Sequence, residues 1–370
     1  MHTGDFHEKP FDEETQCKLD IYRQYLRSWL PVFMNQGKRI RRIQVFDFFS
    51  GPGRDAVGKS GSPLIASEEI ALALKKNSGR LNPDQSVSLF LNEPDNTRHE
   101  ILFKETIPKI KDQNPSLKVH LAKEKFGSLF QEWMKFMHSR DVANFVFLDQ
   151  FGIKETTKEV LQVIWQCPMT DMMFFISSTC VNRFKQDPNL RRYIPEITDE
   201  EYSIMNGNNA TRILYDAYAR WIPNQLEYYL GQFSIKRNAN IYGLLFGSRH
   251  PLGMEKFLKV AWDKDKLHGE ANFDIDEEGL SENQLMLFKD MAKPRKLQRF
   301  ENCLKSALEK QTIKTNKDLY LYGLRNGVLS KHVRDSIMKL SRSGFLPVQN
   351  LNISYKAWSN QGKTQAIRFF

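Results

Sequence analysis

Residues 144–149 have the sequence NFVFLD, and residues 172–177 have the sequence MMFFIS. Neither run shows the alternation of apolar and polar residues that marks a sheet with one face in water, so each fits a strand covered on both faces. Amphipathic stretches with helical spacing separate these runs from further short apolar runs, and this alternation indicates βαβ units. The sequence therefore predicts an α/β fold with a doubly wound, mostly parallel sheet.

The same pattern extends in both directions along the chain. The predicted strands are Ile43–Phe49, Ser86–Asn92, Leu117–Leu121, Asn144–Asp149 and Met172–Ser177. The predicted helices are 13–36, Pro63–Lys76, Arg98–Lys111, Gly127–His138 and Lys154–Gln166. A helical insertion is expected at about 180–230, followed by a strand at Asn240–Gly247 and a helix that ends near Trp262.

Composition limits the class of protein. With 41% hydrophobic and 26% charged residues in 370, disordered, collagen-like and disulfide-scaffold classes are excluded. No apolar run approaches the roughly 18 residues that span a bilayer, and the first residues, MHTGDFHEKPFDEETQ, lack the plan of a signal peptide, so a cytoplasmic protein without membrane contact is expected. The four cysteines are scattered and no histidine lies at metal-ligand spacing from them, so no metal site is expected.

The positive charge is concentrated in the tail. Residues 295–370 hold 15 Lys/Arg and 4 Asp/Glu, whereas residues 1–294 hold 39 and 40. A basic appendage on a neutral body suggests a polyanion partner such as nucleic acid, because Lys and Arg that pair with phosphates release counterions. The alternative is a solvated basic face. We predict a body at 1–280, a linker helix at 281–311 and a basic winged-helix domain at 312–370.

The winged-helix prediction rests on the order of elements in the tail. A helix at Asn316–Leu324, a turn, a second helix at Lys331–Ser341 and two extended segments, Phe345–Tyr355 and Ala366–Phe370, follow the order helix, turn, helix, hairpin. The second helix combines an apolar stripe with a basic face, as a helix in a DNA major groove requires. The stripe is Val333, Ile337 and Leu340, and the basic face is Lys331, Arg334, Lys339 and Arg342. The alternative is a small basic module that docks a protein.

Two strand ends carry the features of a cofactor site. The first predicted strand runs into Asp47-Phe48-Phe49-Ser50-Gly51-Pro52-Gly53. Ligands of doubly wound sheets bind beyond the carboxyl ends of the strands, where glycines allow the backbone to approach a cofactor. Glu93 follows the second strand, where an acidic residue accepts hydrogen bonds from the hydroxyls of a ribose. The alternatives are an ordinary tight turn and an exposed strand end.

The fourth strand supplies the candidate for catalysis. Asp149, Gln150 and Phe151 follow it directly. Asp149 would accept a hydrogen bond from the exocyclic amine of a base while Phe151 stacks on the base, so that catalysis is mainly positioning. The alternative is an Asp149 that caps the helix near Lys154. Arg183, just past the fifth strand, is a candidate phosphate contact, although an exposed helix arginine fits equally well.

A phosphate-loop pattern competes with this interpretation. Gly53-x-x-x-x-Gly58-Lys59-Ser60 matches the pattern literally. However, Ser62-Pro63 is typical of a helix N-cap and first turn, so the helix is expected to begin after the lysine rather than at it. The sequence therefore does not favour the interpretation of this region as the phosphate loop of a nucleoside triphosphatase.

The chain also resembles a known family, the three-Cys-motif partner (TcmP) proteins. The resemblance is carried by FDFFSGPGRD at 46–55 with GSPLIA at 61–66, FVFLDQFG at 145–152, FFISSTCVNRF at 174–184, YGLLFGSRHPLGMEKFLKVAW at 242–262 with GEANFDID at 269–276, and DLYLYGLRNGVLSKHV at 318–333. It implies a Rossmann-like methyltransferase core with S-adenosylmethionine as cofactor, a winged-helix tail and a partner protein with a three-cysteine motif. Gln150 departs from the family's usual Asp-Pro-Phe-Gly.

Together these features lead us to expect an S-adenosylmethionine-dependent methyltransferase that acts on nucleic acid, at a base nitrogen. The cofactor would be held by Asp47, Phe49, Ser50, Gly51, Gly53 and Glu93. The alternative from another class is a non-catalytic module that binds the cofactor and DNA and recruits or regulates its partner, which the Gln150 departure favours.

Overall fold

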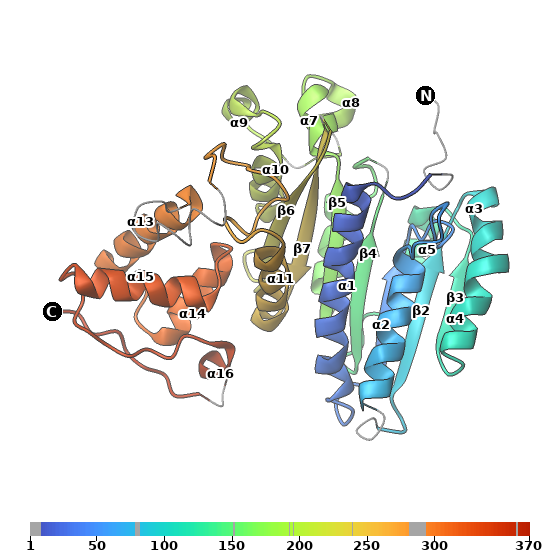
Figure 1. Cartoon of the computed structure of the whole chain (residues 1–370), viewed down its shortest axis with the longest axis horizontal. Helices are drawn as coiled ribbons and strands as arrows, with labels where there is room; N and C mark the ends of the chain where they lie inside the picture. The colour runs from blue at the N-terminus through green and yellow to red at the C-terminus, as the bar shows by residue number, and fades with distance from the viewer. Residues whose placement is uncertain are drawn as a thin grey trace.

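The architecture is seen in a computed structural model (Figure 1). It describes residues 9–77, 82–150, 152–191, 193–194, 196–238, 240–280, 294–359 and 362–370. A central sheet carries helices on both faces, and a helical module formed by the C-terminal residues lies beside one edge of the sheet (Figure 1). Within the described residues, no helix is both long and apolar enough to cross a membrane.

The sheet has seven strands in the order β3-β2-β1-β4-β5-β7-β6. The strands are β1 (Arg42–Asp47), β2 (Ser86–Asn92), β3 (Lys118–Ala122), β4 (Val142–Leu148), β5 (Thr170–Ile176), β6 (Tyr229–Arg237) and β7 (Asn240–Ser248). β1 to β5 pair in parallel, whereas β7 pairs antiparallel with both β5 and β6. The predicted Rossmann-like, mostly parallel α/β sheet is confirmed.

Helices fill the connections between the strands. In the body they are α1 (Glu13–Met34), α2 (Ser62–Asn77), α3 (Asn96–Ile101), the π-helix η1 (Leu102–Thr106), α4 (Ile107–Gln113), α5 (Phe126–Met134), α6 (Lys158–Gln166), α7 (Ser178–Arg183), α8 (Pro188–Arg191), α9 (Asp199–Ile204), α10 (Ala210–Ala219) and α11 (Pro251–Lys264). The expected single helix Arg98–Lys111 is therefore three consecutive segments. The strand β6, at the end of the expected helical insertion, was not predicted.

Two apolar cores lie on the two faces of the sheet. One includes residues of α1, α2, α4 and α11, and the other includes residues of α5, α6 and α10. The central strand β4 is buried over its whole length, as its unbroken apolar sequence predicts. On one face Tyr22, Tyr25 and Trp29 of α1 all pack against Phe145. This aromatic cluster fixes α1 across the middle of the sheet, and so fixes which side chains of α1 reach the strand ends.

The C-terminal module consists of helices α13 (Arg295–Glu309), α14 (Asn316–Arg325), α15 (Ser330–Arg342) and α16 (Tyr355–Trp358). The predicted burial of Val333, Ile337 and Leu340 on α15 is confirmed. The predicted hairpin is wrong: the described residues after α15 form no strand, and their extended backbone pairs only through an isolated bridge between Thr315 and Ala366. Of the linker helix expected at 281–311, the part before residue 294 lies outside the described residues.

The module packs on the body. The Trp262 indole N–H of α11 donates to the Gly327 carbonyl at 3.0 Å, and the Tyr320 hydroxyl donates to the Glu255 carboxylate at 2.7 Å. One continuous apolar core includes buried residues of α1, α11, α13, α14 and α15. Body and tail therefore share their interior.

Candidate functional site

The strand order reverses direction between β1 and β4. Successive connections leave the sheet on opposite sides of this point, and ligands of open α/β sheets bind there, beyond the carboxyl ends of the strands. Asp47 ends β1, Glu93 follows β2 and Asp149 follows β4. Because β2, β1 and β4 are neighbours in the sheet, three acidic side chains gather at one edge. The sequence predicted each of them as a site residue.

The turn after β1 depends on glycine. Gly51 has φ 61° and Gly53 has φ 96°, both in the left-handed region that side chains disfavour. A Cβ atom on Gly53 would lie 2.5 Å from the side chain of Thr106, at the end of η1. The Thr106 hydroxyl donates to the Pro52 carbonyl at 2.7 Å. The glycine at position 53 therefore serves close packing of the turn against η1.

Ser50 and Glu93 tie this turn to β2. The Ser50 N–H donates to the Asn92 carbonyl at 2.9 Å, and the Asn92 N–H donates to the Ser50 hydroxyl at 3.1 Å. The Glu93 carboxylate accepts the N–H of Gly51 and the N–H of Asp95, each at 2.9 Å. Glu93 is 4% exposed, which excludes the alternative of an exposed strand end. Burial raises the pKa of Glu93, opposed by these N–H groups and by Arg98.

Asp47 is the most unusual of the three acids. It is fully buried, and its Oδ1 accepts the N–H of Phe49 at 3.2 Å. Its Oδ2 is buried and has no hydrogen-bond partner of acceptable geometry in the described part of the chain. The pKa of Asp47 is raised to about 7, with burial as the largest cause. The Ser62 hydroxyl and the Phe49 N–H partly oppose this rise, and the negative charges of Asp149 and Glu93 add to it. The protein thus keeps an incompletely paired carboxyl at the strand end.

Asp149 faces a cation from α1. Its carboxylate forms an ion pair with the ammonium of Lys18, which also lies 5.1 Å from the centre of the Phe175 ring. The side chains of Lys18 and Asp149 are 18% and 27% exposed, so the acid is not turned into the interior. Asp149 does not cap the next helix, because α6 begins at Lys158 and has Thr157 as its N-cap.

Gln150 turns inward. Its Nε2 donates to the Thr156 hydroxyl at 2.8 Å, and its Oε1 accepts the N–H of Glu155 at 2.8 Å. The amide therefore fixes the loop that leads to α6 and does not face the acidic side chains. Phe151, the predicted stacking residue, lies outside the described residues.

The other predicted site residues are spread over the molecule. Phe49 is half-buried and stacks on Phe126, with ring centres 5.6 Å apart. Arg183 is exposed at the end of α7. The four basic residues of α15 are exposed, and α15 lies at the far side of the molecule from β2 and β3 (Figure 1). The Arg334 guanidinium donates to the Ile353 carbonyl at 3.2 Å, and Lys339 pairs with Glu301 at 2.9 Å.

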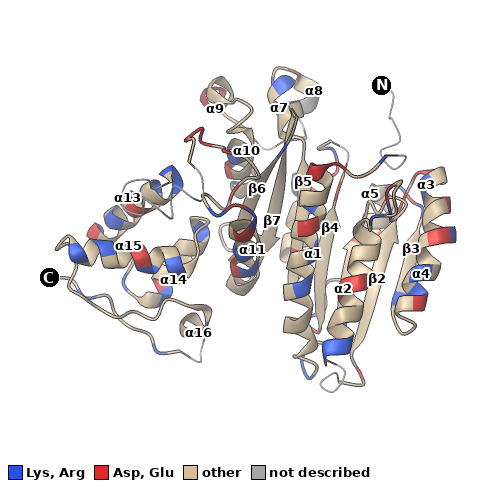
Figure 2. Ribbon diagram, in the orientation of Figure 1, with Lys and Arg blue, Asp and Glu red and all other residues tan. Residues whose placement is uncertain are grey.

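Acidic residues accompany the basic ones on α13, α14 and α15 (Figure 2). The excess of positive charge in the tail is therefore not a single uninterrupted basic face. Lys331 and Arg342, with no ion pair among the described residues, are the side chains of α15 best placed to meet an anion.

Sequence reasoning missed Lys18 and Thr106. Lys18 precedes Asp149 by 131 residues, and no periodicity or motif connects the two. The polar spacing of α1 marks Lys18 only as one residue of an amphipathic helix. Thr106 belongs to a π-helical turn that spacing alone did not indicate.

The phosphate-loop alternative does not fit the local geometry. The Asp55 carboxylate accepts the N–H groups of Val57 and Lys59, at 3.1 and 2.8 Å. In a phosphate loop such amides converge on phosphate. In addition, α2 begins at Ser62, after the lysine, as the sequence predicted.

Comparisons with known proteins are weak. No family model matches the chain, and no curated protein matches it, so the resemblance to the TcmP family stays a prediction. A solved protein from Klebsiella pneumoniae described as an O-methyltransferase is 9% identical, with 64% of this chain and 90% of that chain covered and a TM-score of 0.31. SCL7 of Oryza sativa is 10% identical, with 62% and 83% covered and a TM-score of 0.27.

A loganic acid methyltransferase with SAH is 12% identical, with 94% of this chain and 95% of that chain covered and a TM-score of 0.29. Structural similarity at such low TM-scores does not support any conclusion about the activity of this protein. The fold is therefore argued from the strand order, and the function from the residues at the strand ends.

Proposed function

We propose that the protein is an S-adenosylmethionine-dependent methyltransferase that acts on nucleic acid, at a base nitrogen. The observation that carries the proposal is the Asp47 carboxyl, which is fully buried, lies beside the Ser62 hydroxyl without a well-formed hydrogen bond to its Oδ2, and is influenced by the charges of Glu93 and Asp149. Buried carboxylates are normally paired, so this arrangement fits a ligand that brings positive charge and hydrogen-bond donors to the edge of the sheet.

S-adenosylmethionine meets this requirement. It carries a sulfonium, an ammonium, a carboxylate and two ribose hydroxyls, so that its net charge is positive, and when bound it supplies an electrophilic methyl group. The ammonium would be taken by Asp47 Oδ2 and the hydroxyls by Glu93, whose two oxygens each accept one N–H and retain a second lone pair. A nucleoside triphosphate would instead bring negative charge to three acids, which repel it.

Asp149 is the residue proposed to position the acceptor. An exocyclic amine of a base would donate a hydrogen bond to its carboxylate, in the place that the Lys18 ammonium occupies here. This contact orients the nitrogen lone pair and favours loss of the proton from nitrogen after transfer. Lys18 must therefore give up the carboxylate when the acceptor binds, and the ion pair holds the Asp149 side chain in place until then.

The proposed nucleic-acid contact is the tail. Lys331 and Arg342 on α15 would meet phosphates, with Arg334 and Lys339 beside them. The winged-helix prediction is reduced to its helix-turn-helix part, α14 and α15, because the described residues after α15 form no hairpin. From the resemblance to TcmP proteins, a protein with a three-cysteine motif remains the proposed partner.

Calorimetric titration with S-adenosylmethionine tests the cofactor. We expect saturable binding that Asp47→Asn weakens at least about tenfold, since removing one partner of a buried charge-assisted hydrogen bond costs about 1.5–3 kcal/mol. Asp171→Asn is the matched control: Asp171 is also a buried acid, but it lies near the start of β5, at the opposite end of the strands. Equal binding by wild type and Asp47→Asn, or binding of ATP instead, would contradict the proposal.

Transfer of labelled methyl groups to DNA and RNA tests catalysis. Asp149→Asn should retain cofactor binding and lose transfer. For the tail, replacing both Lys331 and Arg342 by alanine should weaken nucleic-acid binding and lower its salt slope by about two, one for each lost phosphate contact. An unchanged slope would assign the basic residues another role.

A second function has specific support. Lys18 already neutralises Asp149, and the amide of Gln150 is used inside the loop. These two contacts favour a non-catalytic module that binds the cofactor and nucleic acid and regulates its partner. Cofactor binding without methyl transfer to DNA, RNA or the partner would identify this second function.

A further inference from the structure

A group of polar side chains remains outside the proposed site, in the loop that follows α11. His268, Asp276 and Glu278 each bring one potential ligand atom to a common point, and these atoms all lie within 4.8 Å of one another. The loop lies against α13, because the Arg299 guanidinium donates to Asp276 at 3.2 Å and the Arg295 N–H donates to Glu278 at 2.7 Å. The cluster thus lies where the body meets the C-terminal module.

Two atoms of this cluster are buried without partners. His268 is 1% exposed and the Glu278 side chain is 5% exposed. His268 Nε2 and Glu278 Oε2 are 3.6 Å apart, and neither has a hydrogen-bond partner among the residues that the structure describes. A buried polar atom without a partner costs about 1–3 kcal/mol. The two atoms lie within ion-pair distance of each other but too far apart for a hydrogen bond, a spacing at which one ion can contact both.

The other nitrogen of His268 faces a fixed carboxylate. Nδ1 lies 3.7 Å from Asp265 Oδ2. Backbone N–H groups hold the Asp265 carboxylate in place: those of Leu267, His268, Glu270 and Ala271 donate to it at 3.0–3.3 Å. Histidines that bind metals commonly direct their second nitrogen to a carboxylate, which leaves the first nitrogen as a lone-pair donor. Here that donor is Nε2, which faces Glu278.

We propose that His268, Asp276 and Glu278 bind a divalent transition-metal ion of the zinc class. Zinc takes imidazole nitrogen and carboxylate oxygen at about 2.0–2.2 Å, and two donors at that distance from a tetrahedral ion lie about 3.4 Å apart, close to the spacing of His268 and Glu278. An imidazole ligand disfavours magnesium and calcium, which prefer oxygen. The fourth position would hold a water molecule.

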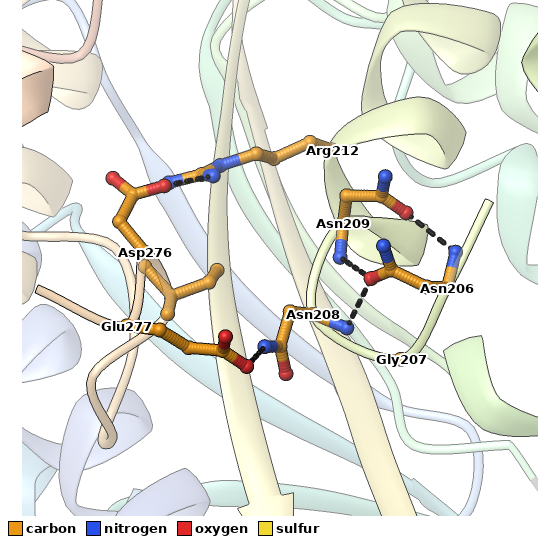
Figure 3. A pocket seen from close by; sticks show the side chains of 8 residues that line it. Asn206, Gly207, Asn208, Asn209, Arg212, Asp276 and Glu277 are labelled. Atoms are coloured by element: carbon orange, nitrogen blue, oxygen red, sulfur yellow. Dashed lines mark hydrogen bonds and ion pairs between the residues drawn. The ribbon is translucent and has the colours of Figure 1, made fainter. Parts of the chain in front are cut away.

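Asp276 would be the third ligand, and two arginines hold its carboxylate in place. Its Oδ1 accepts Arg212 at 2.7 Å (Figure 3), and its Oδ2 accepts Arg299. Carboxylate oxygens have two lone pairs each, so one remains for an ion. The neighbouring cations Arg212, Arg295, Lys296 and Arg299 are balanced by the acids Asp265, Glu270, Asp276 and Glu278. The ion would connect His268, near the end of α11, to Asp276 and Glu278, which contact α13. It would therefore stabilise the junction of body and tail.

Glu277 provides a matched control. It lies between two proposed ligands in the sequence, but its side chain points to Asn208, whose amide donates to it at 2.6 Å (Figure 3). Substituting Glu277→Gln removes the same charge as Glu278→Gln from the same loop without removing a ligand. Any general effect of charge on metal binding should therefore appear in both variants.

The test is a zinc titration of the full chain after treatment with a chelator, followed with a competing indicator dye and by thermal unfolding. We expect one zinc per chain and a higher melting temperature for wild type and Glu277→Gln, with binding at least about tenfold weaker in Glu278→Gln and His268→Asn. Cobalt bound to wild type should show the visible absorption of a low-coordinate centre and lose it on addition of zinc; this measurement needs no variant. Absence of saturable binding by wild type, or wild-type affinity in Glu278→Gln, would overturn the proposal.

Discussion

Replacing Asp47 by asparagine should increase stability at high pH and reduce ligand binding. The pKa of this buried carboxyl rises from 3.8 to about 7, with burial as the main cause, and such a rise corresponds to roughly 4 kcal/mol lost when the group is ionised in the folded state. The sign follows from proton linkage: between pH 4 and 7 the folded protein binds more protons than the unfolded chain, so the free energy of unfolding falls as pH rises. Between pH 5 and pH 8 the loss through Asp47 is about 3 kcal/mol.

Asparagine has no charge to lose, so Asp47→Asn should lack this part of the pH dependence. The amide Nδ2 would be a buried donor in place of Oδ2, at a cost of about 1–3 kcal/mol at every pH. The expected result is a variant within about 1 kcal/mol of wild type at pH 5, because ionisation of the unfolded chain has already cost wild type roughly 1.7 kcal/mol there, and about 1–3 kcal/mol more stable than wild type at pH 8.

Urea unfolding at the two pH values measures the difference. Asp84→Asn, which removes an exposed acid, controls for the loss of one carboxylate. If wild type and Asp47→Asn lose the same free energy between pH 5 and pH 8, the carboxyl is ionised without cost and the argument for a cationic ligand fails.

Three further outcomes follow from individual contacts. Gly53→Ala should lower the free energy of unfolding by about 2–4 kcal/mol, because the added Cβ would lie 2.5 Å from the Thr106 side chain and the backbone φ of 96° disfavours a side chain. In urea unfolding, adding Thr106→Ala should restore part of this loss, and no restoration would mean that the strain lies elsewhere. Tyr25→Phe removes a hydrogen bond of 2.5 Å to Asp171, whose pKa is raised by burial to about 6. The variant should lose about 1–3 kcal/mol in free energy of unfolding, and more at pH 8 than at pH 5, because the ionised carboxylate accepts the stronger hydrogen bond. A loss independent of pH would show that Asp171 does not titrate in this range. Trp262→Phe removes the donor to Gly327 and should cost about 1 kcal/mol and speed proteolysis of the tail, whereas an unchanged digestion rate would mean that apolar contacts alone hold the tail.

The sheet was predictable because its strands carry their own signal. The apolar runs that form β1, β2, β4 and β5 are too apolar for either face of the strand to lie in water, so they predict buried strands. The helices between them predict that these strands pair in parallel. The strand β6 was not predicted because it lies at the sheet edge, where polar residues such as Lys236 and Arg237 interrupt the apolar pattern of its sequence.

The site was predictable only in part. Asp47, Glu93 and Asp149 could be placed together because the carboxyl ends of adjacent parallel strands meet at one edge. The contacts that decide their chemistry come from distant segments: Lys18 on α1 reaches Asp149, and Thr106 on η1 packs against the glycine turn. The Gln150 side chain was assigned to a base on its position alone, and its inward rotamer depends on Thr156, a partner that the spacing did not indicate.

The helix α11 contacts α1 on one side and α14 on the other. A chain that stopped near residue 280 would leave Trp262 and Tyr229 without the covering that Gly327, Lys296 and Arg325 provide. Such a fragment would present bare aromatic surface to water and tend to aggregate. The proposed boundary near residue 280 divides the sequence, but one apolar core continues across it, and we expect neither part to be stable when it is expressed alone.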